Sequence, residues 1–374
     1  MKWSWRVGSI AGIALYIHAT FLLLLAYLAI ANYQATGNVL EAFNGVLFVV
    51  AVFGMVVLHE LGHAFAARRY GIATKDITLL PIGGIARLER MPRDPRQEMI
   101  VALAGPAVNV VIAGVLYVAL MISGGIPDLA EGGVFREGFF SRGFYSGLLA
   151  VNIWLVLFNL IPAFPMDGGR VLRAFLAMRT DDYAEATERA ARVGRFFALL
   201  FGMLGLFVLG NPFLVFVALF VWLAAAGEAA AVQTSVMLDG VPIQRMMIRD
   251  VETLSPDDPL ARPVRIILDG FQQDFPVVTD GVVQGMLTRA KLLKALAEHG
   301  DQTRVGDVMD RQFQQASPWE QADDVLTRLK ACGCHSMPVV RDGQLLGVLT
   351  MDNVGEYVMV QAALKGARTG LARA

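Results

Sequence analysis

Six apolar stretches alternate with polar segments over the first 231 residues of the chain. Most are long enough to cross a bilayer as a helix, and we interpret them as candidate membrane spans. The first exceeds the apolar core of a signal peptide and has no small-residue cleavage site at its end, which predicts a retained helix. The fifth is short, so the last two could instead form one hairpin that crosses incompletely. The predicted spans are residues 8–31, 43–67, 99–122, 144–161, 196–209 and 212–231.

The composition supports a membrane region, because 55% of the 374 residues are hydrophobic and 17% are charged, against roughly 25% charged in soluble proteins. The net charge of −1 argues against a nucleic-acid partner, since no basic excess is available to neutralise phosphates. The two cysteines, Cys332 and Cys334, are too few and too close for the disulfide framework of a secreted domain. We predict that they pack beside a buried strand with His335 rather than bind a second metal.

Basic residues are distributed unevenly between the predicted spans. The segment 68–96 carries seven lysines and arginines, whereas the segment 32–42 carries none. The segment after the fourth span repeats this bias, and the 123–143 segment holds only Arg136 and Arg142. Positive residues concentrate in cytoplasmic loops. The pattern therefore predicts a multi-pass protein of the inner (plasma) membrane with both termini in the cytoplasm.

After residue 232 the chain takes on the composition of an ordinary soluble domain, and it repeats at an offset of 62 residues. The Pro-Val-Val sequence at 276–278 recurs at 338–340, and the Asp-Gly pair at 280–281 recurs at 342–343. Each copy predicts a strand, an Asp-Gly hairpin turn, a second strand and a helix. We therefore expect a membrane domain over residues 1–232 and two copies of one α+β module over residues 233–300 and 301–374.

The sequence His-Glu-Leu-Gly-His occupies residues 59–63, about two turns before the cytoplasmic end of the second predicted span. In a helix His59 and His63 share one face, so both imidazoles can bind one Zn²⁺. Glu60 lies about 100° away around the helix. There it can take a proton from a water molecule that the metal activates and give it to a leaving amine. The motif predicts hydrolysis of an amide bond.

A catalytic zinc site commonly has a third protein ligand. The candidates are His18, Asp167 and Glu228, which all fall in the cytoplasmic half of the membrane, so that depth does not separate them. Asp167 stands in the segment 159–169, whose two prolines and two glycines exclude a plain helix. Broken backbone is tolerated at this depth only where protein or a watery cavity satisfies it, as a hydrolytic site requires. We therefore predict Asp167 as the third ligand, with His18 as a helix-packing residue and Glu228 as a polar helix end.

The motif at 59–63 and the Asn-x-x-Pro-x-x-Pro-x-Asp-Gly-Gly segment at 159–169 together resemble the site-2 proteases, which are intramembrane zinc metalloproteases. The resemblance covers residues 7–232. It implies one zinc ion per subunit, held by His59, His63 and Asp167, with Glu60 as the general base. It also implies that Asn159 helps to hold the substrate or the transition state.

Two further segments agree with this resemblance. The glycine-rich segment 81–86 is similar to the family's membrane-dipping β-hairpin, and the segment 104–109 opens the third span in the family's manner. The implied fold is a polytopic α-helical domain with about six transmembrane helices and a β-hairpin between the second and third. We hypothesise that an unwound substrate adds to a strand edge beside the zinc.

The repeated module resembles a tandem pair of cystathionine-β-synthase (CBS) domains over residues 240–360, including Gly-x-x-Thr segments that end at Thr288 and Thr350. The resemblance implies a cytosolic α+β unit that binds ATP or another adenine nucleotide. The family's ribose-binding aspartate is replaced by Lys291 in the first copy and by Asn353 in the second, which can still hydrogen-bond a hydroxyl. We therefore predict weak or single-site nucleotide binding at Thr350 and Asn353. A docking module without a ligand, or one that forms a homodimer, is the alternative.

The resemblance implies an intramembrane zinc metalloprotease that cuts membrane-associated regulatory proteins in or near their transmembrane segments. Its expected partners are a membrane protein substrate and the lipid bilayer, and nucleotide binding to the CBS pair could regulate it. A CBS-gated transporter or channel is the competing hypothesis, and a catalytically inactive membrane scaffold is a third. A transporter predicts internal symmetry within the membrane region, which the sequence does not show by eye.

Overall fold

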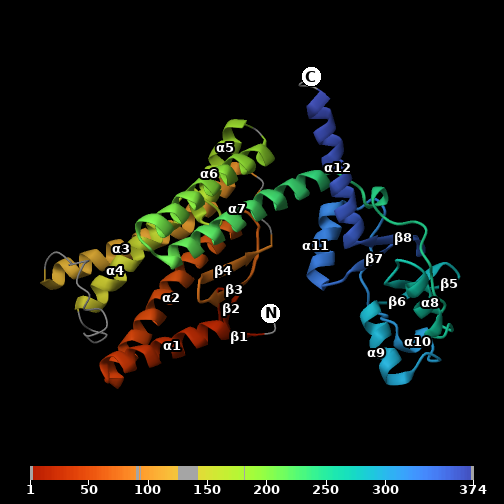
Figure 1. The fold of residues 1–374 in the computed structure, drawn as a ribbon, viewed down its shortest axis with the longest axis horizontal. Coiled ribbons are helices and arrows are strands. Elements are labelled where there is room, and N and C mark those ends of the chain that lie inside the picture. The colour runs from red at the N-terminus through yellow and green to blue at the C-terminus, as the bar shows by residue number, and fades with distance from the viewer. Residues whose placement is uncertain (1–2, 90–91, 93, 125–141, 181, 372–374) are drawn as a thin grey trace. The chain divides into compact units, whose positions relative to one another are not determined.

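The computed structural model describes residues 3–89, 92, 94–124, 142–180 and 182–371. The chain divides into two compact units, Met1–Ala230 and Ala231–Ala374. Figure 1 shows the helices and strands of both. Three of the arginines that were used to predict the topology, namely Arg90, Arg93 and Arg136, lie outside the described residues.

The first unit combines long helices with one small sheet (Figure 1). In chain order its elements are β1 (Ser4–Ile10), β2 (Ile13–His18), α1 (Ala19–Thr36), α2 (Val39–Arg68), β3 (Thr74–Leu80), β4 (Gly83–Leu88), α3 (Pro95–Gly124), α4 (Arg142–Asn159), α5 (Asp167–Thr180), α6 (Tyr183–Met203), the π-helix η2 (Leu204–Val208) and α7 (Pro212–Leu238).

Five of the described helices are long and apolar enough to cross a membrane, namely α1, α2, α3, α6 with its continuation η2, and α7. The predicted segment 144–161 forms α4, which is not among these five, so the count of six stays a prediction. The predicted fifth segment was too short. Its helix begins at Tyr183 rather than at residue 196, and with η2 it reaches 26 residues.

The expectation of one helix over residues 8–31 is wrong. The chain forms the strands β1 and β2 first, and α1 begins only at Ala19. Ala11 and Gly12, which join the two strands, have φ angles of 51° and 87°, as a two-residue hairpin turn requires. Strand β2 also pairs in parallel with β3. The backbone of this apolar segment is therefore satisfied by neighbouring strands instead of by a helix.

The sheet has the order β1-β2-β3-β4, which leaves β4 as an edge strand. The apolar side chains of the sheet share one core with α1 and α2. In this core Ile77 and Leu79 of β3 pack with Phe53, Val57 and Leu61 of α2. The predicted β-hairpin between the second and third spans is present as β3 and β4. Packing of this sheet on α2 brings β4 beside the helix that carries His59 and His63.

The second unit is an α+β domain built from two similar halves. Its elements are the 3-10 helix η3 (Ile243–Arg245), α8 (Ala261–Asp269), β5 (Phe275–Thr279), β6 (Val282–Leu287), α9 (Arg289–His299), α10 (Val305–Val308), α11 (Ala322–Cys332), β7 (Ser336–Arg341), β8 (Gln344–Thr350) and α12 (Met351–Leu371). Its four strands have the order β5-β6-β8-β7. Asp280 and Asp342, at the two predicted hairpin turns, both have a φ of 52°. The 62-residue repeat is thus a repeat of structure.

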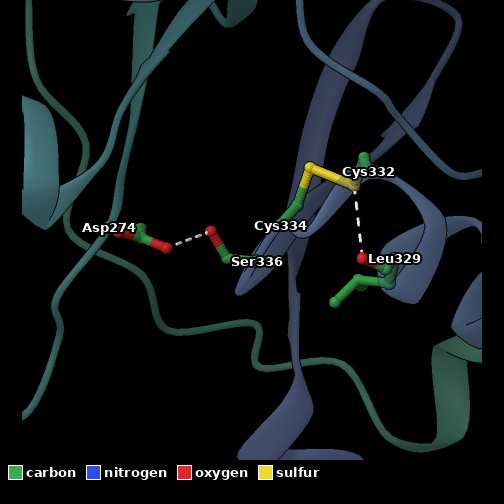
Figure 2. Close-up of a disulfide and its surroundings, with 5 residues drawn as sticks. All are labelled: Asp274, Leu329, Cys332, Cys334 and Ser336. Carbon is green, nitrogen blue, oxygen red and sulfur yellow. Dashed lines mark hydrogen bonds between the residues drawn. A yellow bond between two sulfur atoms is a disulfide. The ribbon is translucent and has the colours of Figure 1, made fainter. Parts of the chain in front are cut away.

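Cys332 and Cys334 form a disulfide at the end of α11, which corrects the prediction that they only pack (Figure 2). Helix α11 ends at Gly333, whose left-handed backbone (φ 66°) reverses the chain between them. Their Cα atoms lie 5.2 Å apart, within the range that a disulfide spans. Figure 2 also shows Ser336 of β7 donating a hydrogen bond to Asp274, which precedes β5, at 2.7 Å.

Candidate metal centre and its surroundings

His59 and His63 lie one turn apart on the buried face of α2, with 6% and 5% of their surfaces exposed. The Nδ1 atom of His63 lies 2.7 Å from the carbonyl oxygen of Val101 in α3. A carbonyl can only accept, so Nδ1 carries the proton and Nε2 is left free to bind a metal. As the motif spacing predicted, the two imidazoles are neighbours, and both are buried between helices.

Asp167 reaches the same point from a different part of the chain, 108 residues after His59. It is the first residue of α5, directly after the non-helical segment 160–166, in which the Phe164–Pro165 peptide bond is cis. Its Oδ2 atom lies 3.1 Å from the Nε2 atom of His59 and 3.1 Å from that of His63. The two Nε2 atoms are also 3.1 Å apart. Three buried ligand atoms thus form a nearly equilateral triangle.

This triangle fits a zinc ion. Ligand atoms that lie ~2.0–2.1 Å from a tetrahedral zinc are about 3.3 Å from one another, close to the spacing observed here. Two imidazoles and a carboxylate are also a donor set that catalytic zinc sites use. Within the described residues, His59, His63 and Asp167 are the group of metal-binding side chains whose ligand atoms converge in this way.

A glycine in α3 makes room for the two imidazoles. A methyl group on Gly105 would collide with the Nε2 atom of His63 and would lie 2.8 Å from the Cε1 atom of His59. Only a residue without a Cβ allows α3 to approach the histidines this closely. Gly105 belongs to the segment 104–109, which resembles the family sequence. Its close packing against the two histidines explains why a glycine stands there.

The side chain of Glu60, next to His59 in the motif, contacts the sheet. Its Oε2 atom accepts a hydrogen bond of 3.2 Å from the backbone N–H of Ala86 in β4. A methyl group on Gly84 would lie 2.9 Å from the Cγ atom of Glu60 and 3.0 Å from Val56, so the glycine lets β4 lie close against α2. The edge strand and the carboxylate are therefore in direct contact.

The other predicted site residues in the membrane unit lie elsewhere. His18 accepts a hydrogen bond from the backbone N–H of Thr20 and caps α1, so it is not a helix-packing residue. Asn159 is the last residue of α4 and is partly buried, and within the described residues it is not part of the converging group. Of the three candidates for a third ligand, the structure brings only Asp167 to the histidines.

Glu228 is an ion-pair partner rather than the polar helix end that its sequence position predicted, and it belongs to a buried charged group. Arg173 of α5 is 1% exposed and donates to Glu98 of α3 at 2.7 Å and to Glu228 of α7 at 2.5 Å. Its guanidinium also lies over the ring of Phe164, at 5.1 Å from the centroid. The group therefore ties the segment before Asp167 to two further helices. Glu228, a carboxylate within the predicted span 212–231, was the available signal, whereas Arg173 counted only among the basic residues that follow the fourth span.

In the second unit the two predicted nucleotide positions differ. Thr350 and Asn353, at the start of α12, are hydrogen-bonded to each other at 2.5 Å. Lys291, at the equivalent position of the first copy, forms an ion pair with Asp310. An open cleft of about 720 Å³ lies along α12 and is lined by Gln244, Arg245, Met247, Arg249, Tyr357 and Gln361. Tyr357 stands one turn after Asn353 on the same face of α12.

Similarity to known proteins agrees with this site. A model of peptidase family M50 matches residues 47–142 and 124–201. A zinc metalloprotease of Methanocaldococcus jannaschii is 30% identical over 354 residues, which are 95% of this chain and 96% of that protein. The chain belongs to peptidase family M50. This M50 peptidase is also similar to Rip3 of Mycobacterium tuberculosis, with 28% identity over 95% of this chain and 92% of that protein.

The similarity covers the second unit of the M50 peptidase as well. CBS domain models match residues 243–298 and 305–359. A crystal structure of the CBS domain of a membrane protein from Sphaerobacter thermophilus is 22% identical over 35% of this chain and 96% of that chain, with a TM-score of 0.30. The protein is thus a metallopeptidase of the membrane with a CBS pair, as the sequence predicted. Family membership favours this function over the transporter and the inactive scaffold.

Proposed function

We propose that the protein hydrolyses peptide bonds in or near the transmembrane segments of membrane proteins, with His59, His63 and Asp167 holding the catalytic zinc. The convergence of three buried ligand atoms within 3.1 Å of one another carries the proposal. A site that is buried among apolar helices suits a substrate that is itself embedded in the bilayer. The test is a paired measurement of zinc content and of cleavage in variants of Asp167 and Glu60.

A zinc ion held by His59, His63 and Asp167 would act as a Lewis acid, which would activate a water molecule and polarise the peptide carbonyl. Glu60 takes the proton from the attacking water and delivers it to the amide nitrogen as the carbon–nitrogen bond breaks. Asn159, which matches the family motif, holds the substrate or the transition state by hydrogen bonding. The proton that leaves water thus ends on the new amine, and the hydroxyl group remains on the new carboxyl.

We propose that β4 aligns the substrate. It is an edge strand of the sheet, and an added strand could pair with its outer side. Its Ala86 N–H points toward Glu60, which places this edge next to the proposed base. A substrate segment that unwinds and pairs with β4 would present an extended peptide bond to the site, whereas a helix would shield it.

Substitution of Gly84 with alanine is expected to reduce cleavage on the order of 10- to 100-fold without loss of zinc. The added methyl group would displace the Glu60 side chain or push β4 away from α2, and misplacement of about 1 Å can cost this much rate. Cleavage rates and metal content of the purified protein would measure it. Gly54→Ala is the matched control, because a methyl group there meets no atom within 4 Å. Full activity of Gly84→Ala would count against the β4 edge as the docking site.

We infer that the CBS pair binds one adenine nucleotide, at Thr350 and Asn353 of the second copy. Both residues can hydrogen-bond a ribose hydroxyl. The cleft along α12 supports this inference, because Arg245 and Arg249 are among its lining residues and arginine binds phosphates well. At the first position the ammonium group of Lys291 is already paired with Asp310.

Titration of the full-length protein with ATP is therefore expected to reveal one weak site. Replacement of Asn353 with alanine should weaken binding, because it removes a partner of the ribose, on the order of 1 kcal/mol or about fivefold. The matched substitution Lys291→Ala should leave the affinity unchanged. Isothermal titration calorimetry would measure both, and two tight sites in the unaltered protein would contradict the inference.

We also propose that the protein lies in the plasma membrane with both termini in the cytoplasm, and that its substrates are membrane-associated regulatory proteins. The lysines and arginines concentrated in the segment 68–96 support the orientation. The substrate class rests on the resemblance to site-2 proteases. A homodimer through the CBS pair is supported by the exposed apolar side chains of Met359, Val360 and Leu364 on α12. The mass of the detergent-solubilised protein would test the dimer.

A further inference from the structure

One ring nitrogen in the proposed zinc site is buried without a partner. A histidine that binds a metal through Nε2 nearly always donates its Nδ1–H to an acceptor, which fixes the tautomer and the orientation of the ring. His63 does so, because its Nδ1 lies 2.7 Å from the Val101 carbonyl oxygen. The Nδ1 atom of His59 is buried and has no hydrogen-bond partner among the described residues. His59 therefore needs an acceptor.

A buried acceptor without a partner stands on the neighbouring helix. Asn109 of α3 is fully buried, and within the described part of the chain neither its Oδ1 nor its Nδ2 atom has a hydrogen-bond partner. Native proteins rarely bury a side-chain amide without any bond, so such a group calls for a functional or structural reason. Asn109 also ends the segment 104–109, to which the proposed mechanism gives no chemical role.

The packing of α2 against α3 places Asn109 at the level of His59. The two helices run antiparallel, because Ala67 of α2 shares a core with Val101, whereas a methyl group on Gly62 would meet Ala104 and Val108. Gly105 lies against the imidazoles of both histidines. Asn109 is one turn beyond Gly105 on the same face of α3, in the direction in which α2 passes from His63 to His59.

We propose that the side-chain carbonyl of Asn109 accepts the Nδ1–H of His59, directly or through one water molecule, and so turns Nε2 of His59 toward the zinc. The inference rests on the proposed zinc site and adds a residue that holds one of its ligands. Asn109 does not touch the substrate, and it acts as a positioning residue through His59. This hydrogen bond would pair the Nδ1–H of His59 with the Oδ1 atom of Asn109, which are otherwise both unpaired among the described residues.

The test is the zinc affinity of Asn109→Leu, measured by competition with a chelator on the full-length protein in detergent. Loss of a partner that orients a ligand typically weakens metal affinity on the order of 10- to 100-fold, and we expect this range for leucine. Asn109→Asp keeps an acceptor oxygen in nearly the same place and should restore the affinity. Should leucine prevent folding, Asn109→Ala removes the same amide with less bulk and gives the same comparison.

Asn152→Leu is the matched control. Asn152 is also fully buried, its Oδ1 atom likewise has no partner among the described residues, and its Nδ2 contacts the Sδ atom of Met55 rather than a histidine. Its loss should lower thermal stability and leave zinc affinity unchanged. Unchanged affinity in Asn109→Leu, or equal losses in both leucine variants, would overturn the inference. If the unaltered protein binds no zinc, the proposed function itself fails, so the two failures are distinguishable.

Discussion

Replacement of Glu60 with glutamine is expected to abolish cleavage while the protein keeps its fold and its zinc. Glutamine has the size of glutamate and retains an oxygen that can accept the Ala86 N–H, so the contact between α2 and β4 survives. It cannot take a proton from water. General base catalysis contributes roughly 10²- to 10⁴-fold, and we expect a loss in this range or larger. Cleavage of a panel of doubly tagged single-span membrane proteins, together with metal analysis, would measure it.

The matched control is Glu41→Gln. Glu41 stands in the first turn of the same helix, five turns before the motif, and should leave cleavage unchanged. Cleavage by Glu60→Gln at the rate of the unaltered protein would refute the assigned base. The inactive variant has a second use, because its natural substrates should accumulate uncut in cells. Identification of those membrane proteins would reveal the substrate that the sequence leaves open.

Replacement of Asp167 with alanine is expected to remove both zinc and activity. The carboxylate is 6% exposed and lies 3.1 Å from both Nε2 atoms, so its loss leaves two imidazoles, one fewer than a catalytic zinc site normally has. Zinc content should fall from about one ion per chain to less than roughly a tenth of that after dialysis. His59→Ala should behave in the same way. Metal analysis of the purified protein provides the measurement.

His18→Asn is the control for this experiment, because His18 was an alternative third ligand. Asparagine is a good N-cap and preserves the hydrogen bond that His18 accepts at the start of α1. Zinc content should therefore stay near that of the unaltered protein. Retention of stoichiometric zinc in Asp167→Ala, or its loss in His18→Asn, would contradict the proposed ligand set. Circular dichroism of the same samples would show that the helices remain folded.

Several features of this protein were predicted from the spacing of residues along the chain. The positions of His59 and His63 follow from helix periodicity alone, and the apolar run around them fixes their membrane environment. The repeat at 62 residues predicted two equal modules with turns at Asp280 and Asp342, and both turns are present. These features depend on residues a few positions apart or on direct comparison of two segments, which a sequence displays without folding.

The tertiary structure decided what depends on contacts between distant segments. Of the three candidate third ligands at similar depth, the sequence favoured Asp167 because of the broken backbone around it, and the tertiary structure brings its carboxylate to 3.1 Å from the Nε2 atoms of both histidines. An apolar segment can satisfy its backbone in a helix or beside another strand, and the presence of β3 decided that residues 13–18 form a strand.

The motif, the apolar runs and the repeat are local patterns, and from them the sequence predicted zinc-dependent hydrolysis in a membrane protein. Only the tertiary structure assigned the individual partners. It pairs Arg173 with Glu98 and Glu228, and it places Gly105 against the imidazoles of His59 and His63. These contacts form between helices that are far apart in the chain, so a local sequence pattern does not predict them.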